Sequence, residues 1–422
     1  MPTGKLARLR SLARVGMRSG LSALTGGDNL GAARQAAELL GNLRGLAAKA
    51  GQMASYVDGL VPDSQREVYE RVLSSLQSAT AHSPFARIRE RIEGELEAPL
   101  SQLFAEFDEE PMASASIGQV HRARLHDGLE VAVKVQHPGI EAAIESDLSS
   151  ADSAAGFAAL LGPKAMNTKD VFAEIAARLR EELDYQLEAQ RQTLFARLHA
   201  DDPKIHVPRI IETHSRRRVM TSELVRGLDL NAAVATSSAE RKAYAETLWR
   251  FVFKSLLTHG AFNADPHPGN YLFHPNGRVS FLDFGCVQLM EPRYVEASRE
   301  MHLGAIECDR ARFERAAAIS CQTMPGPYET DLLAYLWRCF EPLTRSPFRF
   351  ERAYVSSVVR GVQDLKRHMF RKDSGLTPVP TGLVMVNRLQ FGFYSVLARF
   401  DVDVDYAALD REILGRPVAL AV

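Results

Sequence analysis

Residues 262–285 read FNADPHPGNYLFHPNGRVSFLDFG, and the spacing of polar residues in this stretch decides the fold. Asp265 precedes Asn270 by five positions, and Asp283 follows within Leu-Asp-Phe-Gly. Carboxylate and amide oxygens are hard ligands that suit Mg²⁺, and a further carboxylate can orient or deprotonate a nucleophile. We therefore predict a phosphoryl-transfer site in which Asn270 and Asp283 bind Mg²⁺ and Asp265 is catalytic.

A lysine in the upstream sequence VAVKVQ completes this pattern. Val131, Val133 and Val135 alternate around Lys134, and this period of two predicts a strand. A lone strand lysine is usually a solvated surface residue. Here it precedes the Asp, Asn and Asp-Phe-Gly of residues 262–285 in the order found in kinases, where such a lysine holds nucleotide phosphates. We therefore predict that Lys134 is both catalytic and nucleotide-binding.

Periodicity in the rest of the chain predicts helices on both sides of a small β-rich region. Residues 115–139 predict a β-hairpin joined through His126, Asp127 and Gly128. Further strands are predicted near residues 217–224 and around Tyr271 and Phe281. Helices are predicted over 29–78, 86–107, 140–161, 170–199 and 239–258, and over most of the chain after residue 283.

This order of elements predicts the α+β class and a two-lobed protein-kinase-like fold with an N-terminal helical extension and extra C-terminal helices. The predicted segments are a basic amphipathic terminus (1–28), a helical extension (29–107), a small lobe with a helical insert (108–224) and a mainly helical large lobe (225–422).

Composition excludes several classes of protein. The 422 residues are 46% hydrophobic and 24% charged, which is a soluble globular composition. Lys and Arg number 51 against 52 acidic residues, so nothing indicates a nucleic-acid partner. The four cysteines form no C-x-x-C pair, which predicts reduced thiols in a cytoplasmic compartment. No apolar run reaches the ~20 residues of a membrane-spanning helix.

The first 27 residues contain five basic side chains and no acid, interleaved with leucines. This pattern is typical of an amphipathic helix that lies on anionic lipid, which would be a peripheral membrane contact. A solvated terminal helix and a mitochondrial-type transit segment would give a similar pattern, so the compartment stays open.

Two features depart from protein kinases. The position of the Gly-rich phosphate loop carries Ala113, Ser114, Ala115 and Ser116 before Gly118, and Cβ atoms there narrow the backbone conformations that can wrap a phosphate. No A-P-E sequence or activation loop follows Asp-Phe-Gly. The sequence therefore predicts a nucleotide site without a platform for a peptide substrate.

From about Arg44 to Leu289 the chain resembles the UbiB family of atypical kinase-like proteins. Lys49, Gly51 and Gln52 match the K-x-G-Q motif of that family. Residues 113–116 match its Ala-rich loop, EELDYQLEAQ matches its E-x-D helix, and ADPHPGN with LDFG match its catalytic loop and metal-binding aspartate.

The resemblance implies regulatory roles for several residues. Lys49, Gly51 and Gln52 would fold over the nucleotide site and obstruct a peptide substrate, while Glu182 and Asp184 face that extension. Glu188 would pair with the strand lysine. On one continuous helix, Asp184 and Glu188 would share a face and Glu182 would diverge from it.

The resemblance also implies binding of ATP or ADP with Mg²⁺. The predicted nucleotide-binding residues, beside Lys134, are those of the Ala-rich loop together with Glu188, Glu223 and Leu224. The implied function is ATP hydrolysis that supports ubiquinone or isoprenoid lipid metabolism at a membrane surface. Lipid or quinone intermediates and quinone-biosynthesis proteins are the implied partners.

Three residues depart from the family pattern, namely Ser114 and Gly118, where alanine is frequent, and Asn263, where histidine often precedes the catalytic Ala-Asp. Two other functions stay open. ADPHPGN also resembles the D-x-x-P-x-N loop of aminoglycoside and choline kinases, which would indicate a small-molecule phosphotransferase. A pseudokinase scaffold that uses nucleotide as a switch is the other alternative.

Overall fold

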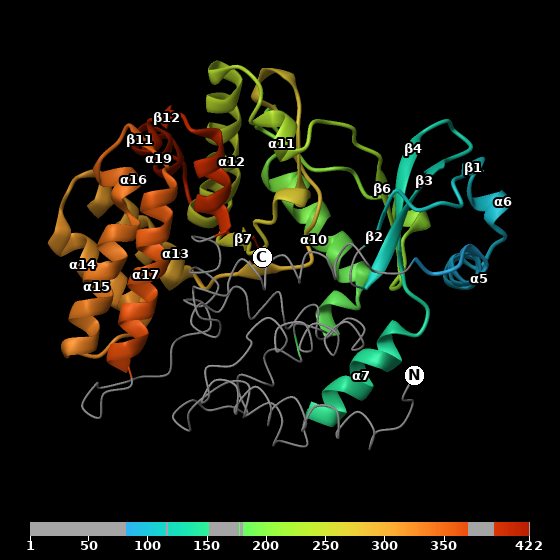
Figure 1. Cartoon of the computed structure of the whole chain (residues 1–422), viewed down its shortest axis with the longest axis horizontal. Helices are drawn as coiled ribbons and strands as arrows, with labels where there is room; N and C mark the ends of the chain where they lie inside the picture. Colours follow the sequence, from blue (N-terminus) through green and yellow to red (C-terminus); the bar gives the residue numbers. More distant parts are fainter. Residues whose placement is uncertain (1–81, 115–116, 152–176, 178–179, 370–391, 422) are drawn as a thin grey trace, which may run out of the picture. The chain divides into compact units, whose positions relative to one another are not determined.

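The computed structural model describes residues 82–114, 117–151, 177, 180–369 and 392–421. The chain divides into two compact units (Figure 1). The first contains residues up to Gln186 together with Ile211–Ser222, and the second contains Leu187–Ile210 and Glu223–Val422. Each unit is described by itself below.

The first unit is built on a five-stranded sheet with the order β1-β3-β4-β6, in which β2 also pairs with β3. The strands are β1 (Glu106–Phe107), β2 (Ala113–Ser114), β3 (Gly118–Arg124), β4 (Glu130–Gln136) and β6 (Val219–Glu223). Antiparallel β3 and β4 form the predicted hairpin, with Arg124 opposite Glu130 and Gly118 opposite Gln136. The predicted strand near residues 217–224 is also confirmed.

One face of this sheet packs against α5 (Phe85–Leu96). Val131, Val133 and Val135 are fully buried in the same apolar cluster as Ile88 and Ile92 of that helix. Burial of such a side chain contributes about 1.5–3 kcal/mol. Because side chains alternate along a strand, the face with the valines is opposite to the one that carries Lys134.

The single helix predicted over residues 86–107 is wrong. After α5, Glu97 adopts a left-handed conformation with φ 56°, and Pro99 precedes the short helix α6 (Leu100–Leu103). Since proline has no amide hydrogen to donate, it can begin the second helix but cannot continue the first. The last two residues of the predicted range form the strand β1.

The continuous helix predicted over residues 170–199 is also wrong where it can be checked. Residues 181 and 182 are helical, Leu183 and Asp184 are not, and α10 starts anew (Tyr185–Leu198). The Asp184 carboxylate accepts a hydrogen bond from the amide of Gln186 at 3.0 Å, and the amide of Tyr185 donates to the carbonyl of Arg217. These bonds replace helical ones, so Asp184 does not share a helix face with Glu188.

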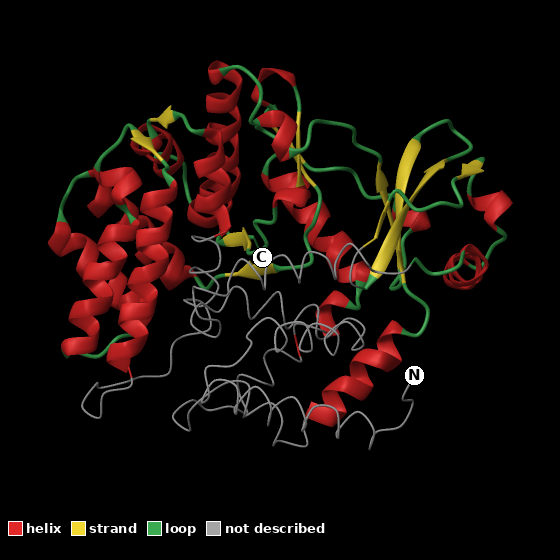
Figure 2. Cartoon of the chain, in the orientation of Figure 1, coloured by secondary structure: helices red, strands yellow, loops and turns green. Residues whose placement is uncertain are grey.

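Among the residues that the structure describes, the second unit contains three small sheets and most of the helices (Figure 2). Strand β9 (Val279–Phe281) lies between β5 (Ile205–His206), which is parallel to it, and β8 (Tyr271–Phe273), which is antiparallel. β7 (Ala261–Asn263) pairs with β10 (Val287–Leu289), and β11 (Phe348–Arg349) with β12 (Asp403–Val404). The two short strands predicted around Tyr271 and Phe281 are confirmed.

Helix α12 (Ser238–His259) is the centre of the second core. The Ser237 hydroxyl caps its start, and Gly260 ends it with φ 63°. Trp249, Leu248 and Leu257 on this helix are buried. The other helices of this unit are α11 (Leu230–Ala233), α13 (Pro292–Ile306), α14 (Arg310–Cys321), α15 (Pro327–Cys339), α16 (Glu341–Thr344), α17 (Arg352–Met369), residues 392–400 and α19 (Tyr406–Leu414).

Helices and a sheet occur together in the structure, which confirms the α+β class. Among the helices that the structure describes, none combines the length and the apolar character that crossing a membrane requires. The predicted basic helix of residues 1–27 and the K-x-G-Q motif lie outside the described residues.

Candidate active site

The loop between β7 and β8 brings Asp265 and Asn270 together. Pro268 begins a short 3-10 helix (Pro268–Asn270), and the His267 side chain caps it by accepting from the amide of Gly269. The Asn270 amide group then points at Asp265, with its nitrogen 3.4 Å from both the carbonyl and the carboxylate Oδ2 of that residue. This turn is the reason for the five-residue spacing in the sequence.

Backbone contacts place Asp283 beside the same loop. The amide of Leu282 donates to the Asn270 carbonyl at 3.0 Å. The Asp283 carboxylate accepts the amide of Gly285 at 2.9 Å, and the ring of Phe284 is fully buried, 5.1 Å from the ring of Phe195. The structure thus assembles all three polar residues of the predicted metal and catalytic positions within the second unit.

These residues fit a magnesium ion that is shared with a nucleotide. Asp283 and Asn270 offer carboxylate and amide oxygens, which is the donor type that Mg²⁺ prefers. In the described part of the chain, no three His, Cys, Asp or Glu side chains gather where they could hold a metal ion by themselves. Mg²⁺ is usually bound by one or two carboxylates plus substrate phosphates, and this donor set matches that usage.

Helix α10 contributes Glu188 and Arg191 next to the Asp-Phe-Gly turn. Glu188 is only 5% exposed, and its carboxylate lies 4.0 Å from the position that a Cβ on Gly285 would take. The Arg191 guanidinium donates to the Gly285 carbonyl at 3.0 Å. Gln192 donates to the carbonyl of Pro208. The helix that carries Glu188 is therefore tied to the Asp-Phe-Gly turn within one unit.

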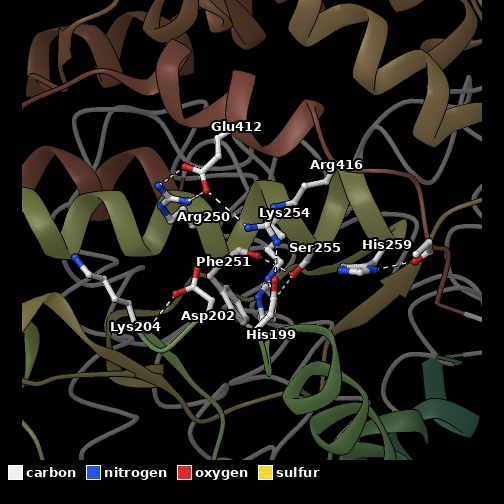
Figure 3. Close-up of polar contacts among 12 residues, drawn as sticks. His199, Asp202, Lys204, Arg250, Phe251, Lys254, Ser255, His259, Glu412 and Arg416 are labelled. Atoms are coloured by element: carbon white, nitrogen blue, oxygen red, sulfur yellow. Dashed lines mark hydrogen bonds and ion pairs between the residues drawn. The ribbon is translucent and has the colours of Figure 1, made fainter.

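A polar cluster anchors the end of α10 to α12 and to the C-terminal residues (Figure 3). His199 forms a hydrogen bond through Nε2 with the Ser255 hydroxyl at 2.7 Å. Lys254, 3% exposed, pairs with Asp201, which also binds Arg416 at 2.6 Å. Burial alone would raise the pKa of Asp201, but these two cations lower it to about 2. Arg250 and Glu412 make a bidentate pair in the same cluster.

In the first unit, Lys134 lies on β4 with its ammonium 5.0 Å from the centre of the Tyr185 ring. A Cβ added to Gly118 would lie 2.5 Å from the Tyr185 hydroxyl and equally close to the carbonyl of Val135. Glycine at position 118 avoids this crowding, because it has no Cβ.

The loop residues Ala113 and Ser114 form β2, which pairs with β3. The Ser114 hydroxyl is buried and has no hydrogen-bond partner within the described residues. Ala115 and Ser116 lie outside those residues, as do Lys49, Gly51 and Gln52. Their predicted roles stay predictions.

Glu223 ends β6 and faces His206. Its carboxylate is 3.6 Å from His206 Nε2, and its amide donates to the carbonyl of Arg209. Burial lowers the pKa of His206, and Arg278 lowers it further, against the opposing effect of Glu223. Leu224 follows directly and is half-buried. Contact of either residue with a nucleotide stays a prediction, as does the pairing of Lys134 with Glu188.

Sequence reasoning did not predict a role for three residues, one in the first unit and two in the second. In the first unit, the Tyr185 ring faces the ammonium of Lys134. In the second, Arg191 donates to the Gly285 carbonyl and Asn263 bonds to both Asp265 and Asp283. Only Asn263 had a signal in the sequence, because it departs from the family pattern. Glu182 and Asp184 are half-buried in the first unit, and their role towards the extension stays a prediction.

Comparisons with known proteins identify the family of this chain. The ABC1 atypical kinase-like domain matches residues 75–317, more than half of the chain. Atypical kinase COQ8, mitochondrial, from Saccharomyces cerevisiae is 29% identical over 89% of this chain and 75% of its own length. The chloroplastic protein ACTIVITY OF BC1 COMPLEX KINASE 3 from Arabidopsis thaliana is 38% identical over 57% of this chain, but the match spans only 35% of that protein.

A solved structure with a similar fold is the complex of Rv3197 with erythromycin from Mycobacterium tuberculosis. It covers 95% of this chain and 100% of its own, with 26% identity and a TM-score of 0.63. The kinase-like fold and the family resemblance are both confirmed by these matches. The chain belongs to the ABC1 atypical kinase-like family, also known as the UbiB family.

Proposed function

We propose that this protein binds Mg²⁺ with ATP or ADP and hydrolyses ATP in support of ubiquinone or isoprenoid lipid metabolism at a membrane surface, with little phosphorylation of other proteins. The assembly of Asp265, Asn270 and Asp283 in one unit is the observation that carries this proposal. Membership in a family of atypical kinases supports it.

Each of these residues would have a separate role in the reaction. Asn270 and Asp283 hold Mg²⁺, which when bound neutralises phosphate charge. Asp265 would orient or deprotonate the attacking water, because its carboxylate lies beside Asn270, the proposed Mg²⁺ ligand. Lys134 binds the phosphates, and Glu188 is its proposed partner.

Regulation and nucleotide contacts extend this proposal. The Ala-rich loop, Glu223 and Leu224 would contact the nucleotide. Lys49, Gly51 and Gln52 would cover it, with Glu182 and Asp184 facing that extension.

The segment after Asp-Phe-Gly supports the low activity on proteins. Strand β10 begins at Val287 and α13 already begins at Pro292. The chain between them therefore has no room for an activation segment of the kind on which protein kinases present a peptide.

The test is ATP hydrolysis by the full chain, with and without Mg²⁺, anionic liposomes and a phenolic mimic of a quinone precursor. Asp265→Asn should lower kcat by about 10²–10⁴-fold while nucleotide still binds. Asp283→Asn should abolish the Mg²⁺ dependence of nucleotide affinity. Asp401→Asn is the matched control, because Asp401 is an exposed residue with φ 48°, a conformation that asparagine adopts readily.

Three results would count against the proposal. If Asp283→Asn binds nucleotide with the same Mg²⁺ dependence as the wild type, Asp283 is not a ligand of Mg²⁺. Restored quinone content in cells that carry Asp265→Asn would favour a scaffold without turnover. Sedimentation with anionic liposomes that is unchanged when residues 1–27 are deleted would remove the proposed membrane contact of that segment.

A second candidate is a small-molecule phosphotransferase. The solved Mycobacterium structure is a complex with the small molecule erythromycin, which favours this reading for a related fold. Transfer of the γ-phosphoryl group from ATP to a soluble hydroxyl compound in a metabolite screen would support it. Hydrolysis to ADP and inorganic phosphate without any phosphorylated acceptor would support the ATPase.

A further inference from the structure

Asn263 makes two hydrogen bonds that join the catalytic loop to the metal-binding turn. It is the last residue of β7 and pairs with Val287 of β10. Its side-chain nitrogen donates to the carbonyl of Asp283 at 2.5 Å, and its side-chain oxygen accepts the amide of Asp265 at 3.1 Å. One amide group thus contacts both residues whose separation matters for phosphoryl transfer.

Other contacts also hold the backbone on both sides of the two Asn263 hydrogen bonds. The β7–β10 pairing continues with a bond from the amide of Ala264 to the carbonyl of Cys286 at 2.8 Å. Arg191 donates a hydrogen bond to the Gly285 carbonyl, and the ring of Phe284, which lies between Asp283 and Gly285 in the chain, is buried. The Asn263 contact differs from these because it also reaches Asp265.

We propose that Asn263 is the positioning residue that sets the separation between Asp265 and Asp283. The two bonds need a donor towards Asp283 and an acceptor towards Asp265. An asparagine amide supplies one of each from a single rigid group, and a neutral imidazole also has one donor and one acceptor nitrogen. An aspartate keeps the acceptor but places a carboxylate against the Asp283 carbonyl, and an alanine supplies neither.

The inference rests on the proposed function, because it concerns Mg²⁺ binding at Asp283. The test measures ATP affinity by calorimetry in the presence and absence of Mg²⁺, and separately kcat and KM for hydrolysis. Outer partners of metal ligands typically contribute about 10–100-fold in metal affinity or activity. Asn263→Ala is therefore expected to weaken the Mg²⁺-dependent part of ATP affinity by about 10–100-fold and to leave Mg²⁺-free binding unchanged.

Two further variants separate positioning from general stability. Asn263→Asp should lose at least as much as Asn263→Ala, and Asn263→His at pH 8 should recover most of the loss. Asn231→Ala is the control, since Asn231 is an exposed asparagine on α11 whose side chain accepts a hydrogen bond from Arg399 at the surface. Its Mg²⁺ dependence should equal that of the wild type.

The outcomes distinguish the two proposals. Wild-type protein without Mg²⁺-dependent nucleotide binding would overturn the proposed function and this inference with it. Equal Mg²⁺ dependence in wild type and Asn263→Ala would overturn the inference alone. Equal losses with and without Mg²⁺ would also overturn it, because they indicate a general loss of structure.

Discussion

Moderate acid should destabilise the second unit through His199. This side chain is 2% exposed, and its ring lies 5.0 Å from the ring of Phe251 in a stacked arrangement. Burial and, to a smaller extent, the electrostatic effects of Lys254 and His259 lower the pKa of His199 from 6.5 to about 3, against the opposing effect of Asp201. Protonation at mild acidity is therefore favourable only in the unfolded chain.

The hydrogen bonds explain why the folded state resists the proton. The Ser255 hydroxyl donates to the carbonyl of Phe251 at 2.7 Å, so its oxygen accepts from His199 Nε2. The neutral tautomer thus carries its hydrogen on Nε2. A second proton would go to Nδ1, which is buried without a hydrogen-bond partner in the described structure.

The size of the effect follows from the two pKa values. A pKa that is lower in the folded state means that the stability is fully present above about pH 6.5 and is lost as the pH falls towards 3. With values of 6.5 unfolded and about 3 folded, His199 alone should reduce the free energy of unfolding by about 1.2 kcal/mol between pH 7 and pH 5.5.

Urea unfolding followed by tryptophan fluorescence measures this loss. Both tryptophans, Trp249 and Trp337, lie in the second unit, so the signal reports the unit that contains His199. In His199→Gln, whose side-chain amide can still donate to Ser255, the loss between the two pH values should be smaller by about 1.2 kcal/mol. His126→Gln changes an exposed histidine of the first unit and should behave as the wild type. Equal acid sensitivity in wild type and His199→Gln would refute the reasoning.

Two other substitutions test the packing around the site. Gly118→Ala should destabilise the first unit by about 1–3 kcal/mol, because the new methyl group meets the Tyr185 hydroxyl and the Val135 carbonyl, and hydrogen exchange of the β3 and β4 amides should accelerate. Unchanged exchange would show that the strands adjust without cost. Lys254→Met should reduce the acid sensitivity of the second unit, since removing this buried charge raises the pKa of His199. The same urea experiment checks it, and an acid sensitivity equal to that of the wild type would contradict it.

Local patterns in the sequence predicted the β3–β4 hairpin and helix α12 correctly. The β3–β4 hairpin follows from apolar residues at every second position, and the start and end of α12 agree with the predicted helix over residues 239–258 within one residue at each end. The two long helices predicted over 86–107 and 170–199 are each interrupted by the backbone. In both, a backbone group does not make the next helical bond: Pro99 has no amide hydrogen to donate, and the amide of Tyr185 donates to the carbonyl of Arg217 instead.

The sequence by itself determined which residues are proposed for catalysis, because phosphoryl transfer demands particular functional groups and their order along the chain is specific. Asp265, Asn270, Asp283 and Lys134 could all be named from spacing. Only the tertiary structure decided what holds them. The bond from Asn263 to Asp283 and that from Arg191 to Gly285 join residues far apart in the chain, and no local periodicity records which distant backbone groups a polar side chain will meet.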